Sequence, residues 1–430
     1  MTRQRIQRLA SRSRMAVACL AVVAGLSACS NLLDVDFPGR IPLAALDDPT
    51  LASTLVTGVI GDLECAYNNY AGGAAVHSDE FETANSNVPL ANWGERGINA
   101  DEDDYVVGGC EASLSNFGMH TVLHTARYQA DTVYDRLNNW TDAQVANRRS
   151  LMATVRAYGA YAETFMGETF CQVAFNGEAA QPPTAALTRA EAHFTEAVSL
   201  ATAAGNADIA NLARVGLARI KVDLKKWSEV AAIASAVPAG YEKFADRGSE
   251  NDRRWNKIWF LANNLGAYVV ADEYRTMADP RVDVAYANRG AFNPGTELWV
   301  ARKYTGLGSP IRLASYREAQ LLLAEANAQL GNVSAAMTIL NARRSGLGLT
   351  PLSASTQTAA VAAVLSERQR ELAFEGGHRL NDILRYSTST TNRIPWKGAF
   401  GSTKTANDYT GRPYGATTCW PFPTKESNGA

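Results

Sequence analysis

Aromatic and amide side chains gather in two parts of the sequence, and their combination suits sugar binding. A sugar presents an apolar C–H face together with hydroxyl groups, so a flat ring beside an amide side chain offers matching contacts. Trp93 with its neighbour Asn92 is the strongest candidate ligand-binding pair, followed by Trp299 and Tyr70. The alternative for each ring is to pack beneath a loop as satellite core, because buried aromatic residues are common. The two groups are Tyr67, Asn68, Asn69, Tyr70, Asn85, Asn87, Asn92, Trp93, Asn99 and Tyr105, and then Trp255, Trp259, Trp299 and Tyr304.

The sequence has no constellation that is typical of an enzyme. His120 and His124 are spaced i, i+4 and could share a metal ion, but no HExxH motif occurs and no carboxylate is fixed beside them. The acidic run 101–104 could bind calcium, although it lacks the glycine and the spacing of an EF-hand loop. Nucleophile-elbow, Walker and dinucleotide-binding motifs are also absent. We therefore expect no catalytic residue, no bound metal and no cofactor.

The N-terminus has the pattern of a bacterial lipoprotein leader. Five arginines precede an apolar run from Met15 to Leu26, which is too short to span a bilayer. A small-residue cleavage site then places Cys29 directly after Ala28. We expect a signal peptide over residues 1–28 and acyl chains on the Cys29 thiol, which would anchor the mature chain to a membrane. The alternative is an ordinary signal peptide that happens to be followed by a cysteine.

The charge of the mature chain excludes one class of partner. The chain has 41 basic and 43 acidic residues, and removing the five leader arginines leaves a net charge of −7. A mildly acidic protein has no electrostatic reason to bind nucleic acid. After the leader, no apolar stretch approaches the length of a transmembrane helix.

Four cysteines remain once the leader and the anchor are set aside. An even number of cysteines in an exported protein predicts two disulfides, and four cysteines allow three pairings. The absence of a CxxC spacing argues against a zinc site. We favour Cys65–Cys110 as a local loop closure and Cys171–Cys419 as a tether for the C-terminal tail.

Helical patterns dominate the chain. Apolar residues recur at helical spacing over about 111–137 and 143–167, and three further helices are expected between about 188 and 236. Shifting the sequence by 106 residues aligns Leu217-Ala218 with Leu323-Ala324 and Trp227-Ser228 with Val333-Ser334. Each copy has the pattern of a tetratricopeptide-like helix hairpin. The predicted fold is mainly α: helix hairpins that form a scaffold, with long loop-rich insertions.

A family resemblance is carried by the segment that begins in the second copy. Residues 316–349 read YREAQLLLAEANAQLGNVSAAMTILNARRSGLGL, and residues 364–386 read VLSERQRELAFEGGHRLNDILRY. Both resemble the C-terminal half of SusD/RagB proteins, although the usual spacing has one residue fewer between Glu375 and Arg379. The charged motif residues are expected to be structural, with Gly376-Gly377 ending their helix.

The resemblance implies a fold, a location and a function. It implies a single SusD-like domain over residues 29–430, with loop-rich insertions at about 60–110 and 240–312. It further implies a lipid-anchored, surface-exposed protein of the cell outer membrane that binds an oligosaccharide or similar nutrient. Its partner would be a SusC-like, TonB-dependent transporter barrel, for which it acts as a lid without catalysing a reaction. The alternatives are a helical scaffold that binds only proteins, and a hydrolase without a recognisable motif.

Overall fold

The computed structural model describes residues 43–78, 80–101, 103–112, 117–402 and 412–424. The expected signal peptide and Cys29 lie outside the described residues. Met1–Asp48 is a unit of its own, in which η2 (Leu43–Asp47) is a short 3-10 helix, and Pro49–Ala430 is the second unit. No helix among the described residues is both long and apolar enough to cross a membrane.

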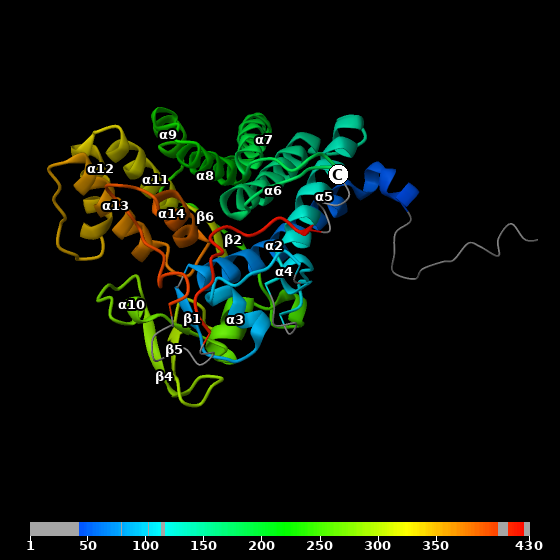
Figure 1. Cartoon of the computed structure of the whole chain (residues 1–430). Helices are drawn as coiled ribbons and strands as arrows, with labels where there is room; N and C mark the ends of the chain where they lie inside the picture. The colour runs from blue at the N-terminus through cyan, green and yellow to red at the C-terminus, as the bar shows by residue number, and fades with distance from the viewer. Residues whose placement is uncertain (1–42, 79, 102, 113–116, 403–411, 425–430) are drawn as a thin grey trace, which may run out of the picture. The chain divides into compact units, whose positions relative to one another are not determined.

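The second unit is mainly helical, as the sequence predicts (Figure 1). Helix α6 packs against α5 on one side and α7 on the other, and α2 packs on both α5 and α6. Small residues allow close approach between helices: a Cβ at Gly216 of α8 would come within 2.2 Å of the Phe194 ring of α7. The long helices are α2 (Ala52–His77), α5 (His120–Asn139), α6 (Arg148–Thr169), α7 (Thr184–Ala203) and α8 (Ala207–Asp223).

The expected repeat corresponds to two helix hairpins. The first pairs α8 with α9 (Trp227–Ala234), and the second pairs α11 (Tyr316–Gln329) with α12 (Val333–Ser345). The first residues of α9 and α12 are separated by the same 106 positions that align the two copies. The tetratricopeptide-like reading of these segments is therefore confirmed.

The first insertion differs from its prediction. Residues 67–70 were expected in a loop, but they lie inside α2, which continues to His77. The second half of α2 is buried, and it contains Asn68-Asn69 and Gly72-Gly73, residue pairs that are typical of turns and loops. Beyond α2, the region carries short elements joined by loops. These are β1 (Phe81–Thr83), α3 (Val88–Gly94) and α4 (Asp103–Val106), and η3 (Pro49–Leu51) precedes α2.

The second insertion is non-helical in the main, as expected for about 240–312. Among the described residues it contributes to three two-stranded antiparallel sheets, which pair β1 with β3, β2 with β6 and β4 with β5. The β1–β3 pairing joins the two insertions. The elements are β2 (Glu242–Ala245), η5 (Asp252–Arg254), η6 (Trp259–Asn264), β3 (Tyr268–Val270), α10 (Asp272–Arg275), β4 (Val284–Gly290), β5 (Glu297–Ala301) and β6 (Ile311–Ser315).

The motif segment forms α13 (Gln357–Glu371) and α14 (His378–Tyr386). The glycine pair does not end α13, which stops at Glu371. Both glycines instead have positive φ, +64° and +68°, in the turn that leads into α14. A Cβ at Gly377 would also come within 2.5 Å of the Tyr70 ring, so the position requires glycine for two reasons.

The motif's charged residues are buried in ion pairs, which supports the structural role expected for them. Asp382 accepts hydrogen bonds from Arg368 at 3.0 Å and from Arg385 at 2.6 Å. Glu325 of α11 accepts a further bond from Arg385 at 2.5 Å. These contacts connect α11, α13 and α14 beside the smaller of two large apolar cores.

Two disulfides close the fold, with the pairing favoured from the sequence. Cys65 of α2 is bonded to Cys110, and Cys171 is bonded to Cys419. Next to the second bond, Trp420 is fully buried and its backbone N–H donates to Thr169 at 2.7 Å. The C-terminal segment is thereby fixed to the end of α6.

Candidate ligand-binding site

Three of the four sequence candidates lie in the core. The Trp93 side chain is 1% exposed, with its ring centroid 5.8 Å from that of Phe117 and 5.4 Å from that of Trp420. The Oδ1 atom of the adjacent Asn92, which is also buried, accepts a hydrogen bond from Arg412 at 2.9 Å. These contacts connect α3 with the C-terminal segment. A sugar reaches neither side chain without displacing core neighbours, so the expected site at this pair is corrected to core packing.

Tyr70 is likewise a core residue. It lies on α2 and is fully buried, and its hydroxyl donates to Glu168 Oε2 at 2.7 Å. Burial and the neighbouring Glu168 carboxylate raise the pKa of this phenol well above its usual range. Arg219 forms an ion pair with the same carboxylate at 2.5 Å, so the Tyr70 hydroxyl belongs to an internal hydrogen-bond and ion-pair network. Its polar end is therefore satisfied inside the protein.

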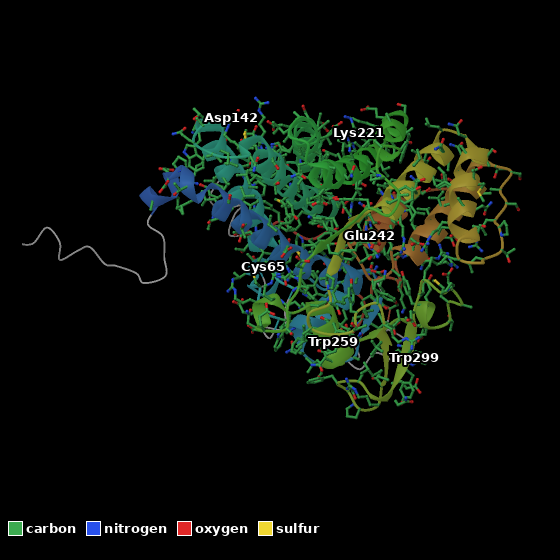
Figure 2. The ribbon with its side chains drawn as sticks, turned by 180° about the vertical axis from the view of Figure 1, so that it is seen from behind. Cys65, Asp142, Lys221, Glu242, Trp259 and Trp299 are labelled. Atoms are coloured by element: carbon green, nitrogen blue, oxygen red, sulfur yellow. A yellow bond between two sulfur atoms is a disulfide. The ribbon has the colours of Figure 1, made fainter. Side chains whose placement is uncertain are left out.

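Trp299 has a different environment. It lies on β5 directly opposite Tyr286 of β4, and the two ring centroids are 6.0 Å apart with the planes inclined by 38°. Tyr286 is 39% exposed and Trp299 is half-buried. Figure 2 labels Trp299 on this hairpin. The pair is a two-ring aromatic surface that solvent reaches.

Strand side chains alternate between faces, and the two faces of this hairpin contact different parts of the protein. Trp299 is partly buried against the main apolar core, so Tyr286 is the more exposed ring of the pair. Leu298 is fully buried and packs with Ala84, Val269 and Ala291 in a small apolar cluster. Trp299 follows Leu298, so its side chain lies on the opposite face of the strand. Burial of the Leu298 face thereby fixes which face the aromatic rings occupy.

Polar groups surround the Trp299 ring. The indole N–H donates to Glu297 Oε2 at 2.9 Å, and the Arg275 guanidinium carbon lies 5.8 Å from the ring centroid. Burial lowers the pKa of Arg275, and the ion pair with Asp272 at 2.7 Å offsets only part of that effect. Both carboxylates are exposed, and Glu297 contacts the Trp299 indole directly, whereas Asp272 contacts Arg275, which lies over the ring. Rings that contact C–H groups and carboxylates that accept hydroxyl hydrogens are the elements of a sugar-binding surface.

Tyr286 was missed by the sequence reasoning, although a signal for it exists. Asn293-Pro294-Gly295 is a turn sequence between two segments of strand type. Recognising that turn predicts a hairpin, and the hairpin brings an aromatic residue of each strand together. Among the other rings of the second group, Tyr304 is buried and donates to the Phe374 carbonyl at 2.8 Å. Trp255 and Trp259 are half-buried: Trp255 lies against Phe260 with centroids 5.3 Å apart, and Trp259 packs against the main core.

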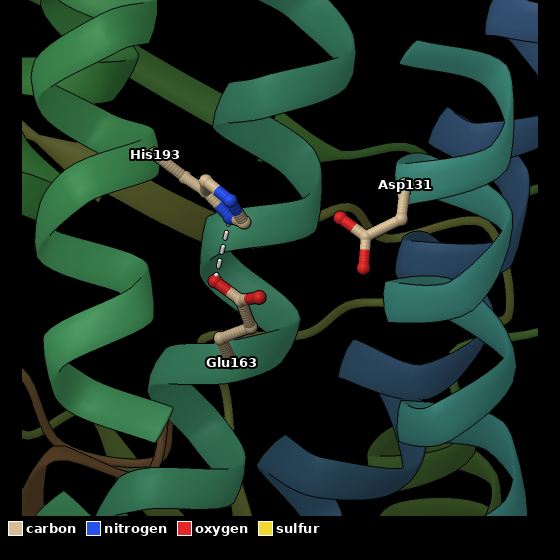
Figure 3. A group of neighbouring side chains, drawn as sticks. All are labelled: Asp131, Glu163 and His193. Atoms are coloured by element: carbon tan, nitrogen blue, oxygen red, sulfur yellow. Dashed lines mark hydrogen bonds and ion pairs between the residues drawn. The ribbon is translucent and has the colours of Figure 1, made fainter. Parts of the chain in front are cut away.

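One cluster of metal-ligand type occurs among the described residues. Asp131 of α5, Glu163 of α6 and His193 of α7 offer ligand atoms within 4.8 Å of one another, and His193 Nδ1 lies 2.9 Å from Glu163 (Figure 3). Arg189 bridges both carboxylates, at 3.0 Å from Glu163 and 3.1 Å from Asp131. Arg127 adds a contact to Asp131 at 3.2 Å. Because guanidinium groups already compensate these carboxylates, the cluster is an ion-pair network between helices.

The other two candidate metal sites are the histidine pair on α5 and the acidic run. The rings of His120 and His124 have centroids 4.3 Å apart, and both stack against Phe170. Burial lowers the pKa of His120 to about 4 and that of His124 to about 3, so both rings are neutral at neutral pH. Of the acidic run at 101–104, only the side chain of Asp101 is described, and it accepts a hydrogen bond from Thr424.

Comparison with known proteins identifies the relatives of this chain. Residues 249–428 match the SusD family. The fold resembles that of a SusD homolog from Bacteroides thetaiotaomicron, with 15% identity, a TM-score of 0.66, and 91% of this chain and 98% of that chain covered. It also resembles a SusD-like carbohydrate binding protein from Bacteroides vulgatus, with 16% identity, a TM-score of 0.60, and coverage of 83% and 86%.

A third similar structure is surface glycan-binding protein A from Bacteroides uniformis, with 14% identity, a TM-score of 0.58, and coverage of 86% of this chain and 97% of that chain. No curated protein matches the sequence. The resemblance carried by residues 316–386 and the mainly α fold class predicted from the helical patterns are thus confirmed.

Proposed function

We propose that this chain, whose residues 249–428 match the SusD family in a SusD-like fold, is a glycan-binding lipoprotein of the bacterial outer membrane. Its lipid would be attached at Cys29 and would hold the mature protein at the membrane surface. It binds an oligosaccharide or similar nutrient without altering it. A TonB-dependent transporter barrel receives the ligand, and this protein acts as its lid.

The observation that carries the binding role is the Tyr286–Trp299 pair. Two aromatic rings lie side by side on a hairpin with solvent access, next to the exposed carboxylates of Asp272 and Glu297. Tyr286 is exposed and Trp299 is half-buried, so a ligand that covers the pair removes further apolar surface from water, which stabilises the complex by about 25 cal/mol per Å². A sugar that stacks on one ring and hydrogen-bonds to the carboxylates uses all of these groups.

Binding to soluble polysaccharides and their oligosaccharides tests this role. Affinity electrophoresis against a panel of glycans identifies a ligand, and calorimetry with the best oligosaccharide then compares variants. We expect Trp299→Ala to weaken binding about tenfold, which corresponds to about 1.4 kcal/mol, and Tyr286→Ala to weaken it by a similar or smaller factor. The matched control is Tyr128→Ala, which removes an aromatic side chain that is 55% exposed on α5. This control should bind as the wild type does.

The transporter partnership needs a separate experiment. Affinity purification of the tagged, lipidated protein from native membranes in mild detergent should recover a large TonB-dependent β-barrel. Recovery of soluble envelope proteins without a barrel would instead support the scaffold alternative. A Cys29→Ala variant provides the control, because it should lose the lipid and fractionate away from the membrane. Retention of that variant in the membrane fraction would contradict the anchor.

A further inference from the structure

A cavity of about 400 Å³ lies between α11, α12 and α13. Its volume is in the range that small-molecule sites occupy. Neither Tyr286 nor Trp299 is among the residues that line it, so the cavity is distinct from the aromatic pair. Leu321 of α11 and Ile339, Leu340 and Ala342 of α12 supply its apolar lining.

Two glutamates of α13 line the cavity, and arginines compensate both. Arg343 forms a two-pronged contact with Glu371, with both nitrogen–oxygen distances at 2.9 Å. Glu367 receives Arg281 at 2.7 Å and Arg344 at 2.7 Å. Glu367 and Glu371 are 3% exposed, so neither carboxylate offers an unshared charge to a ligand.

Among the arginines that line the cavity, Arg317 lies farthest from its nearest carboxylate partner. Its guanidinium lies 3.5 Å from Glu371, which already has the closer Arg343, and its side chain is 42% exposed. The lining holds Arg281, Arg317 and Arg343 against two glutamates, an excess of one positive charge. A guanidinium has five N–H donors, so Arg317 can still bind a carboxylate at the mouth of the cavity.

We propose that this cavity binds an apolar carboxylate, with its hydrocarbon part against Leu321 and Ile339 and its carboxylate on Arg317. A peptide C-terminus with a hydrophobic last side chain has this chemistry, and so does a fatty acid. A free amino acid does not fit, because its ammonium group would approach three arginines and find both glutamates occupied. This site is independent of the proposed glycan-binding role.

Calorimetric titration of the intact protein with small probes tests the proposal. N-acetyl-leucine represents a peptide C-terminus and octanoate a fatty acid, while N-acetyl-leucinamide lacks the charge. At least one of the two acids should bind saturably, with one site per chain. If the natural ligand is a peptide C-terminus, N-acetyl-leucinamide should bind at least tenfold more weakly than N-acetyl-leucine. Tighter binding of octanoate than of N-acetyl-leucine would assign the fatty acid as the source.

Two variants locate the site. Arg317→Gln should weaken binding of the acid about tenfold, and Ala342→Phe should abolish it by filling the cavity. Both positions are exposed on their helices, so the fold and the glycan affinity should be unchanged. Arg149→Gln is the matched control, because Arg149 is 59% exposed and lies on α6. Absence of saturable binding by both acids, binding of the amide as tight as that of the tighter-binding acid, or wild-type affinity in Ala342→Phe would overturn the proposal.

Discussion

Glu80 is a carboxyl group that the fold buries with little compensation. Its Oε1 accepts a hydrogen bond from the Phe374 backbone N–H at 2.8 Å, and its Oε2 has no hydrogen-bond partner among the described residues. Burial raises the pKa of Glu80 to about 7, against the opposing effect of that hydrogen bond and of Lys303. The folded protein therefore holds a proton here that the unfolded chain releases near its ordinary pKa of 4.5. Stability contributed by this proton is present at low pH and is lost as pH rises from about 4.5 to about 7.

Replacing Glu80 by glutamine should remove that loss. Glutamine keeps an oxygen for the Phe374 N–H and carries no charge, so Glu80→Gln should be more stable than wild type by about 1–3 kcal/mol at pH 8. The difference should shrink toward zero below pH 5. Urea denaturation at several pH values measures it, with Glu250→Gln, at an exposed position, as control. A variant that is less stable than wild type at pH 8 would show that Glu80 is favourably charged in the native state.

The aromatic residues show where reasoning from single residues stops. Trp93 and Trp299 are the same residue type, yet Trp93 lies in the core and Trp299 lies half-buried on a hairpin. Trp93 is buried by Phe117 and Trp420, which are distant along the chain, so its local sequence carries no sign of that burial. The chemistry of the candidate site was predicted, but which members are accessible depends on tertiary contacts.

Among the elements, the two helix hairpins repeat each other down to their turns. Lys225 and Gly331 are separated by the repeat length, and both have positive φ, +57° and +80°. In both turns this residue donates to the carbonyl three positions before it, at 3.0 Å, and the next residue donates to the carbonyl five positions before it, at 2.8 Å. This is a Schellman motif, in which glycine is the favoured residue.

Exchanging lysine and glycine at this position should therefore change the stability of the protein in opposite directions in the two turns. Lys225→Gly should stabilise the protein by about 0.5–1 kcal/mol, because a left-handed conformation costs an L-residue about 1–2 kcal/mol and glycine's extra entropy recovers only part of that cost. Gly331→Lys should destabilise it by about 1 kcal/mol, and the open space around that glycine excludes a steric cause. Urea midpoints report both changes. Equal signs for the two variants would contradict the equivalence of the turns.

The predictability of the helices follows their local sequence rather than their burial. The hairpins were predicted because apolar residues recur at helical spacing and the two copies align, although α8 is buried over most of its length. Helix α2 was not predicted, because Asn68-Asn69 and Gly72-Gly73 are residue pairs typical of turns and loops. Its tyrosines and asparagines find partners elsewhere, as when Asn69 donates to the Gly118 carbonyl at 2.9 Å, and nothing local reveals this.

At the scale of the whole molecule, the two disulfides close loops of very different length. Cys65–Cys110 spans 45 positions and Cys171–Cys419 spans 248. The entropy that a cross-link removes from the unfolded chain grows with the logarithm of the loop length. The long-range bond therefore constrains the unfolded chain more strongly.

Replacing each cysteine pair by serine should destabilise the protein, and the loss should be larger for Cys171 and Cys419 by about 1.5 kcal/mol. Urea denaturation without reductant gives both values, and wild type with reductant gives the combined loss. A larger loss for the shorter loop would show that local packing around Cys65 outweighs chain entropy.

Tyr286 and Trp299 of the β4–β5 hairpin are the residues at which we propose that a glycan binds. A crystal structure with the tightest-binding oligosaccharide tests this proposal most directly, because it shows where the sugar lies. We predict a sugar ring stacked on Trp299 or Tyr286, with hydroxyls that donate to Glu297 or Asp272. An oligosaccharide bound elsewhere on the molecule, with both rings uncovered, would contradict the account.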